Sequence, residues 1–168
     1  MDDKLLIIDN FFKPEELKYF SYMVDNLSWT FGAYSKVDQG YRFWSSNLYT
    51  NTDLINCSMN KIHKEFNFKR KFEIIRVHAN GQTYGQDGIF HTDDKREGHY
   101  TFLIYMSEST HDLGSHTQFK IGEQLINIEP LKNRGVFFKS SILHRGMAPS
   151  RNTDRLRVTI AFKLRECW

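Results

Sequence analysis

Residues 91–93, His91-Thr92-Asp93, are the stretch from which the fold and a site can be worked out. In an extended strand, successive side chains point to opposite faces, so residues two positions apart share a face. His91 and Asp93 could therefore bind one ion from the same side. A histidine and an acid at this spacing arise easily by chance in a chain with seven histidines and twenty acidic residues. The surrounding sequence must therefore support the interpretation.

A second histidine, His144, lies downstream in a setting that fits a metal site. It follows an apolar, strand-like run at residues 135–138 and precedes a turn region that contains Gly146. Two imidazoles and one carboxylate on one face of an octahedral ion are the ligand set of non-haem iron(II) oxygenases. His91, Asp93 and His144 are thus candidate metal ligands.

A strand that begins with arginine is expected at residues 155–164, after His144. A guanidinium aimed inward near the metal could donate two parallel hydrogen bonds to the carboxylate of an iron-chelated dicarboxylate. Arg155 is our first choice for this role. Arg157 is its rival, because it lies on the same face of the strand.

Composition indicates an ordinary globular protein. The 168 residues suit one domain, with 40% hydrophobic and 26% charged residues and a net charge of +3. No apolar run is long enough to span a membrane and the N-terminus is no signal peptide, so we expect a cytoplasmic protein without a membrane partner. Because Lys and Arg are dispersed among acids, a nucleic-acid partner is conceivable but not indicated.

The order of hydrophobic patterns predicts two helices followed by a series of strands. Pro14 and the acids after it mark the start of one helix, and Thr52 could cap a second. From residue 72 the pattern is that of short strands and turns. We therefore expect a mainly β fold of the α+β class in a single domain, residues 1–168. Helical support should occupy about 12–67, with one or two strands near 29–49, and an antiparallel sandwich or barrel about 71–165.

The ordered motifs resemble the prolyl 4-hydroxylase branch of the 2-oxoglutarate and Fe(II)-dependent dioxygenases. The resemblance extends over residues 5–164, nearly the whole chain. The residues that carry it are His91-Thr92-Asp93, Gly114-Ser115-His116-Thr117-Gln118-Phe119, Pro130 with Gly135-Val136-Phe137-Phe138, His144, and Arg155 with Thr159.

This resemblance implies a double-stranded β-helix (jelly-roll) core with iron bound by His91, Asp93 and His144. It implies Arg155 as the partner of the distal carboxylate of 2-oxoglutarate. Tyr84 and Tyr105 match tyrosines that line the cosubstrate pocket in prolyl hydroxylases, and Thr159 matches a hydroxyl on the strand that bears the basic residue, so all three are implied cosubstrate-binding residues. The implied cofactors are Fe(II), 2-oxoglutarate as cosubstrate and O2, with ascorbate as a candidate stimulant.

The chain departs from the family pattern in three places. It has Gly114-Ser115-His116-Thr117 where the family usually has Gly-Gly-Glu-Thr, and Arg155 follows His144 by eleven positions, one or two more than is typical. His78 stands where prolyl hydroxylases often have a tyrosine, which makes it a candidate lining residue of the pocket. None of these departures affects the three ligands.

The resemblance implies hydroxylation of a C–H bond with release of succinate and CO2, on a prolyl or other peptidyl residue. Two alternatives remain open at this point. The same chemistry could act on a free amino acid, another small metabolite or a nucleobase. The chain could also be a non-catalytic jelly-roll binding module, although such a module has no reason to keep all of His91, Asp93, His144 and Arg155.

Overall fold

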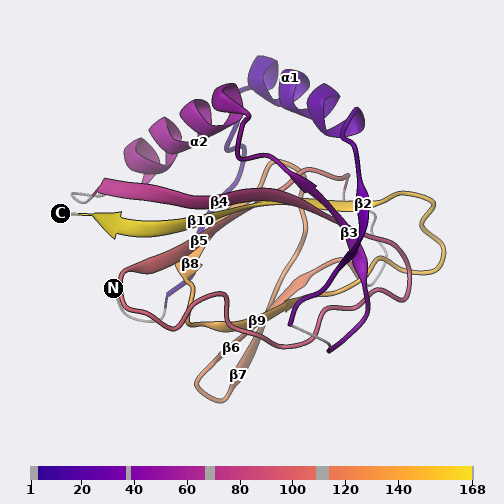
Figure 1. Cartoon of the computed structure of the whole chain (residues 1–168). Helices are drawn as coiled ribbons and strands as arrows, with labels where there is room; N and C mark the ends of the chain where they lie inside the picture. The colour runs from indigo at the N-terminus through magenta and orange to yellow at the C-terminus, as the bar shows by residue number, and fades with distance from the viewer. Residues whose placement is uncertain (1–3, 37–38, 67–70, 109–113, 168) are drawn as a thin grey trace.

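Two antiparallel sheets and two helices make up the part of the chain that the computed structural model describes, which is residues 4–36, 39–66, 71–108 and 114–167 (Figure 1). The seven-stranded large sheet has the order β1 (Leu6–Ile8), β8 (Gly135–Lys139), β5 (His99–Tyr105), β10 (Arg157–Cys167), β4 (Lys71–Gln82), β3 (Phe43–Asn47), β2 (Thr30–Ala33). The three-stranded small sheet has the order β7 (Gln124–Ile128), β6 (Thr117–Ile121), β9 (Leu143–Gly146). The mainly β prediction is confirmed.

Helices α1 (Pro14–Asp25) and α2 (Thr52–Glu65) cover the face of the large sheet that is turned away from the small sheet (Figure 1). The helix start at Pro14 is confirmed. The predicted cap Thr52 is wrong by one residue, because the side chain of Asn51 accepts the hydrogen bond from Leu54 N at 2.9 Å. Neither α1 nor α2 is long and apolar enough to cross a membrane, and no other helix occurs among the described residues.

The region expected to be helical support contains strands as well. β2 and β3 lie between the two helices in sequence; β3 pairs with β4, and β2 pairs with β3 to form the edge of the large sheet. This region therefore both covers the large sheet and extends it.

The long ladder between β4 and β10 separates the core from the site. Its apolar alternate residues, Val77, Ala79, Val158, Ile160 and Phe162, are buried in the cluster that includes the helices. The residues between them are mostly polar and face the small sheet, since side chains alternate across a strand. One face of the ladder thus builds the core and the other builds a polar cavity.

Asn133 ties the segment before α1 to the sheet. Its side chain accepts a hydrogen bond from Phe12 N at 2.8 Å and donates one to Phe12 O at 2.8 Å, and both groups are buried. Its backbone N–H donates to Tyr105 O at 2.8 Å. Asn133 has φ +69°, in the left-handed region that asparagine tolerates better than most residues. It therefore satisfies buried backbone groups from two distant segments at once.

Replacement of this residue should be costly. We expect Asn133→Ala to lower the free energy of unfolding by about 2 to 4 kcal/mol, because it leaves the Phe12 N–H and C=O unpaired and strains the backbone. Asn133→Gly removes the same side-chain bonds without the strain and should cost about 1 to 3 kcal/mol. Urea unfolding followed by circular dichroism measures both. Wild-type stability in the glycine variant would contradict this role for the side chain.

Candidate metal centre

His91 and His144 are brought together by direct backbone pairing. His91 N donates to His144 O at 3.0 Å and His144 N donates to His91 O at 2.9 Å, which forms an isolated antiparallel bridge. His144 lies on β9, while His91 lies in the segment that enters the site before β5. This bridge places the two rings 4.6 Å apart, centroid to centroid.

Each histidine ring is held by a backbone carbonyl two residues earlier. The Nδ1 of His91 lies 2.9 Å from Ile89 O, and the Nδ1 of His144 lies 2.8 Å from Ile142 O. Because a carbonyl only accepts, each Nδ1 is the donor, which leaves each Nε2 as the nitrogen that can bind a metal. Hydrogen bonds of this kind fix the tautomer of a metal-binding histidine.

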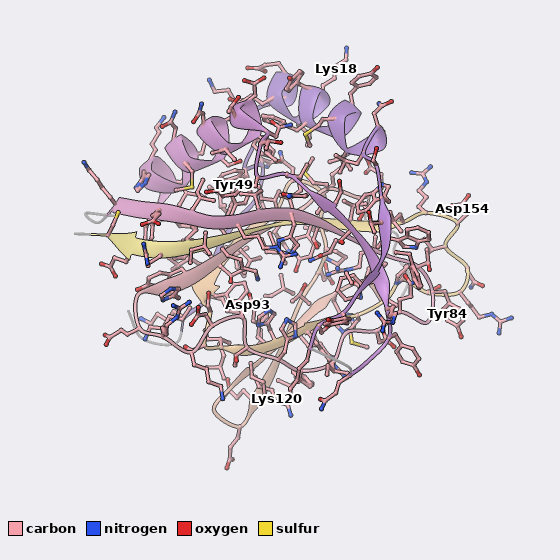
Figure 2. All side chains as sticks on the ribbon, viewed as in Figure 1. Lys18, Tyr49, Tyr84, Asp93, Lys120 and Asp154 are labelled. Atoms are coloured by element: carbon pink, nitrogen blue, oxygen red, sulfur yellow. The ribbon has the colours of Figure 1, made fainter. Side chains whose placement is uncertain are left out.

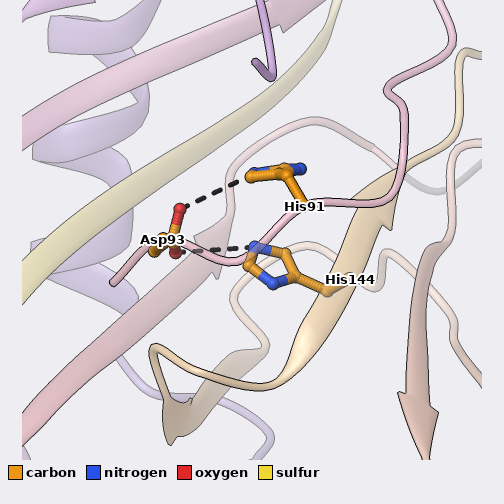
Figure 3. A group of neighbouring side chains, drawn as sticks. All are labelled: His91, Asp93 and His144. Atoms are coloured by element: carbon orange, nitrogen blue, oxygen red, sulfur yellow. Dashed lines mark ion pairs between the residues drawn. The ribbon is translucent and has the colours of Figure 1, made fainter. Parts of the chain in front are cut away.

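Asp93 faces the two Nε2 atoms (Figure 3). Its Oδ1 lies 3.6 Å from His91 Nε2, and its Oδ2 lies 3.5 Å from His144 Nε2. One donor atom from each of the three residues lies within 4.8 Å of the others. The predicted triad is therefore brought together in a geometry that could bind one cation.

A second layer of polar residues holds the Asp93 carboxylate. Thr101 Oγ1 donates to Asp93 Oδ2 at 2.7 Å and lies 3.0 Å from Ser140 Oγ. Asp93 N donates to Ser140 O at 2.9 Å. Lys163 forms an ion pair with Asp93 Oδ2.

The charges of the site favour cation binding near neutral pH. Burial opposes ionisation of Asp93, but Lys163 and the neighbouring histidines hold the pKa of its carboxyl well below the usual range. Burial lowers the pKa of His144 to about 4. At pH 7 the site therefore offers a carboxylate and a neutral imidazole rather than a protonated one.

The triad lines a cavity of about 190 Å³ between the two sheets. Other parts of its wall come from β4, β5, β6 and β10, so the cavity extends along the polar face of the large sheet. The lining residues that carry or share charge are Arg76, His78, His91, Asp93, His144, Arg157 and Lys163.

Arg157 is a buried cation at one end of this cavity, with only 4% of its surface exposed. Its guanidinium donates to Ser115 O at 2.6 Å, Gln82 Oε1 at 2.7 Å and Thr117 Oγ1 at 3.0 Å. All three acceptors are neutral, and no carboxylate pairs with Arg157 among the residues that the structure describes. A guanidinium has five N–H groups, so donors remain for a further acceptor.

Arg155, our first choice for the carboxylate-binding residue, is wrong on position. It precedes β10, its side chain is 68% exposed beside Asp154, and it lines a separate surface hollow. We expected the strand to begin at residue 155, whereas the ladder begins where Arg157 pairs with Gln82. Arg157, the rival, is the arginine that lines the cavity.

The two predicted tyrosines also lie outside the cavity lining. Tyr84 is 65% exposed and lines another surface hollow, and Figure 2 shows it at the edge of the molecule, away from Asp93. The glycine-rich segment after β4 turns outward before it reaches His91, which carries Tyr84 to the surface. Tyr105 is fully buried behind the wall, where its hydroxyl donates to Thr117 Oγ1 at 2.7 Å and its ring lies 5.7 Å from the Arg157 guanidinium carbon.

Thr159 and His78, two of the candidate cosubstrate-binding residues, line the cavity. Sequence reasoning missed four other polar residues of β4 and β10 that also line it: Arg76, Asn80, Gln82 and Lys163. The signal was present, because residues 76–82 alternate strictly between polar and small or apolar side chains.

The structure is similar to solved structures of 2-oxoglutarate and iron(II) oxygenases. An oxidoreductase of the 2OG-Fe(II) oxygenase family from Burkholderia pseudomallei has a TM-score of 0.78 at 10% identity, over 96% of this chain and 84% of that one. A prolyl hydroxylase from Trichoplax adhaerens, in complex with a hypoxia inducible factor peptide fragment, has a TM-score of 0.72 at 13% identity, over 98% of this chain and 84% of that one. The viral collagen prolyl hydroxylase of Paramecium Bursaria Chlorella virus-1, solved as a 2OG complex, has a TM-score of 0.66 at 16% identity, over 97% of this chain and 96% of that one.

These likenesses establish the fold. The chain has the jelly-roll fold of the 2-oxoglutarate and iron(II) oxygenases, as predicted, and places a His-Asp-His site in it. The same fold occurs in a non-heme alpha ketoglutarate dependent epimerase and a carbocyclase of nogalamycin biosynthesis, so it does not select one reaction. No protein-family model matches the sequence, and neither does any curated protein.

The hydroxyl of Thr101 should matter to metal affinity. We expect Thr101→Val to weaken Co(II) binding about 10- to 100-fold, because Asp93 loses the hydrogen bond that orients its carboxylate. Thr101→Ser keeps the hydroxyl and should bind within about threefold of wild type. Isothermal titration calorimetry measures all three proteins. Equal affinity in wild type and the valine variant would show that Thr101 does not orient the ligand.

Proposed function

We propose that this protein is an Fe(II)- and 2-oxoglutarate-dependent oxygenase that hydroxylates a C–H bond. The observation that carries the proposal is that one cavity contains both a His-Asp-His site and a buried arginine, Arg157, that pairs with no carboxylate among the described residues. The fold around this cavity is that of the 2-oxoglutarate and iron(II) oxygenases. A metal site alone would fit many proteins. A 2-oxoglutarate-dependent oxygenase also needs a cationic side chain that binds the distal carboxylate of the metal-chelating dicarboxylate.

The donor set fits iron(II). Two imidazoles and one carboxylate on one side of an ion leave the other coordination positions open, which is the arrangement of non-haem Fe(II) oxygenases. His91 and His144 would bind through Nε2 and Asp93 through a carboxylate oxygen, with Thr101 holding that carboxylate. Two structural neighbours, one in complex with Fe3+ and alpha ketoglutarate and one with nickel and 2-oxoglutarate bound, support a metal and this cosubstrate here.

Arg157 fits the distal carboxylate of 2-oxoglutarate. Burial of a cation without an anion is costly, since each desolvated ion loses several kcal/mol of hydration. The neutral acceptors Gln82, Thr117 and Ser115 fix the guanidinium without cancelling its charge. A carboxylate from the cosubstrate would supply that charge and use the remaining N–H donors.

The bound cofactors and the residues of the cavity would have different roles in the reaction. Bound iron and 2-oxoglutarate would supply O2 activation and the electrons for it, with succinate and CO2 as co-products. Arg157 orients the cosubstrate, Thr159 lines the wall beside it, and the buried apolar face of the large sheet keeps water from behind the site. O2 is therefore an expected substrate, and stimulation by ascorbate and a cytoplasmic location stay predictions.

The substrate proposed first is a prolyl or other peptidyl residue, as the sequence predicts. A neighbour in complex with a peptide fragment supports a peptide, whereas an epimerase and a carbocyclase among the neighbours support small molecules. A free amino acid or other small metabolite is therefore the second candidate, and the cationic lining of the cavity favours it.

Anaerobic titration with Fe(II) and 2-oxoglutarate tests the proposal. We expect a weak visible charge-transfer band of the iron chelate in the wild type. Arg157→Gln should raise the 2-oxoglutarate concentration at half-saturation at least about tenfold, which corresponds to about 1.4 kcal/mol. Arg155→Ala, the matched control on the surface, should stay within about twofold of wild type.

A second cosubstrate separates loss of recognition from loss of folding. 2-Oxobutanoate keeps the chelating end but lacks the distal carboxylate, so wild type should bind it at least about tenfold more weakly than 2-oxoglutarate. Arg157→Gln should no longer distinguish the two acids. If iron binds to the wild type and no band forms with 2-oxoglutarate, the oxygenase proposal fails and a binding module becomes the better description.

A further inference from the structure

The end of the cavity opposite Arg157 carries a second group of cations. In the β4–β10 ladder, Arg157 pairs with Gln82, Thr159 with Asn80, Ala161 with His78 and Lys163 with Arg76. All eight residues line the cavity. The ladder therefore places one arginine at its first residue pair and an arginine–lysine pair at its seventh, on the same face.

The Arg76–Lys163 pair is unfavourable for the protein alone. Like charges directly opposite one another on neighbouring strands repel and destabilise the sheet. Lys163 has Asp93 as an ion-pair partner, whereas the side chain of Arg76, an exposed residue, has no ion pair or hydrogen bond among the described residues. Structural needs therefore do not explain Arg76, which sits at the rim of the cavity and also lines an adjoining surface hollow.

His78 supplies a third polar group at the same end. It is only 8% exposed, yet its Nδ1 is buried without a hydrogen-bond partner in the described part of the chain. Buried polar atoms usually find a partner, so an unpaired nitrogen on a side chain that lines a cavity indicates a missing acceptor or donor. His78 lies beside Arg76 and Lys163 and lines the same cavity.

A count of charge shows that the proposed cofactors do not neutralise the cavity. Among the described residues that line it, Asp93 is the only acid, against Arg76, Arg157 and Lys163. With a divalent iron the cavity has five positive charges, while Asp93 and the two carboxylates of 2-oxoglutarate provide three negative ones. Two positive charges remain, at the end of the cavity that the cosubstrate does not occupy.

We propose that Arg76 and Lys163, with His78 beside them, bind the carboxylate of a small acid, and that this acid is the molecule hydroxylated. The inference rests on the proposed function, which defines the other end of the cavity as the cosubstrate site. It names the substrate class that the proposed function leaves open, a low-molecular-weight carboxylic acid such as a free amino acid.

A free acid fits the Arg76–Lys163 end of the cavity better than an internal residue of a peptide does, because this end lies beside the metal ligand Asp93. Lys163 contacts Asp93 itself, so an anion on Lys163 lies close to the metal and hence to the carbon that reacts. In a peptide chain the groups that flank an internal residue are neutral amides. Those amides cannot offset two cations, whereas the carboxylate of a free acid can.

Paired acids and amides test the inference on protein loaded with Ni(II), which supports no turnover, and saturating 2-oxoglutarate. The probes are the twenty L-amino acids and their primary amides, which differ mainly in the charged group. Isothermal titration calorimetry first measures 2-oxoglutarate and then each probe. We expect at least one acid to bind at least tenfold more tightly than its amide.

Variants then assign the charge to the residues. Arg76→Gln should raise the Kd of that acid at least tenfold and leave the Kd of 2-oxoglutarate within twofold. The matched control is Arg165→Gln on the same pair of strands, where the guanidinium is already neutralised by Glu73 at 2.8 and 2.9 Å. This control should bind the acid as wild type does.

Failure of the proposed function and failure of the further inference give different results. If 2-oxoglutarate itself does not bind the Ni(II)-loaded protein, the proposed function fails. If 2-oxoglutarate binds but no acid binds more tightly than its amide, the inference is overturned. It is also overturned if Arg76→Gln binds the acid as wild type does, or if a capped prolyl peptide such as N-acetyl-Gly-Pro-Gly-amide binds more tightly than every acid.

Discussion

The antiparallel pairing of β4 with β10 is the constraint on which the rest of this structure depends. The ladder runs over nearly the full length of both strands, and its two faces have opposite chemistry. The apolar face is covered by α1 and α2, and the polar face forms the long wall of the cavity. If the register of one strand shifted by one residue, all of its polar side chains would face the core. The packing of the core and the position of the site residues therefore require the same register.

The His91–His144 bridge is the second constraint, and it acts at a different level. Two backbone hydrogen bonds join segments that are far apart in sequence, and the side chains follow from that pairing. Neither ring depends on a side-chain contact for its tautomer, because the carbonyls of Ile89 and Ile142 set it. The ligand geometry is therefore a product of the backbone, which is the least variable part of a fold.

Sequence reasoning found the parts of the site that are local or that alternate. His91 and Asp93 share a face because of their spacing, and His144 was recognisable from the strand before it and the turn after it. The arginine was misplaced because the start of β10 is decided by its partner Gln82, which no pattern within residues 155–164 reveals. Tyr84 was misplaced for a related reason, since the path of a glycine-rich segment depends on what it packs against. Arg76 and Lys163 were readable from the alternation but have meaning only once the two strands are known to be neighbours.

His144 belongs to the core of the small sheet as well as to the site. Its ring stacks on Phe119 with centroids 5.7 Å apart, and the edge of Phe138 meets it at 4.9 Å. Both phenylalanines are buried members of the smaller hydrophobic cluster. A cation bound by His144 would therefore hold the small sheet to the large one through Asp93, and ligand binding of this kind adds its free energy to that of folding. Loss of the ion would then be felt first as faster amide hydrogen exchange in β6 and β9, before any change in the helices.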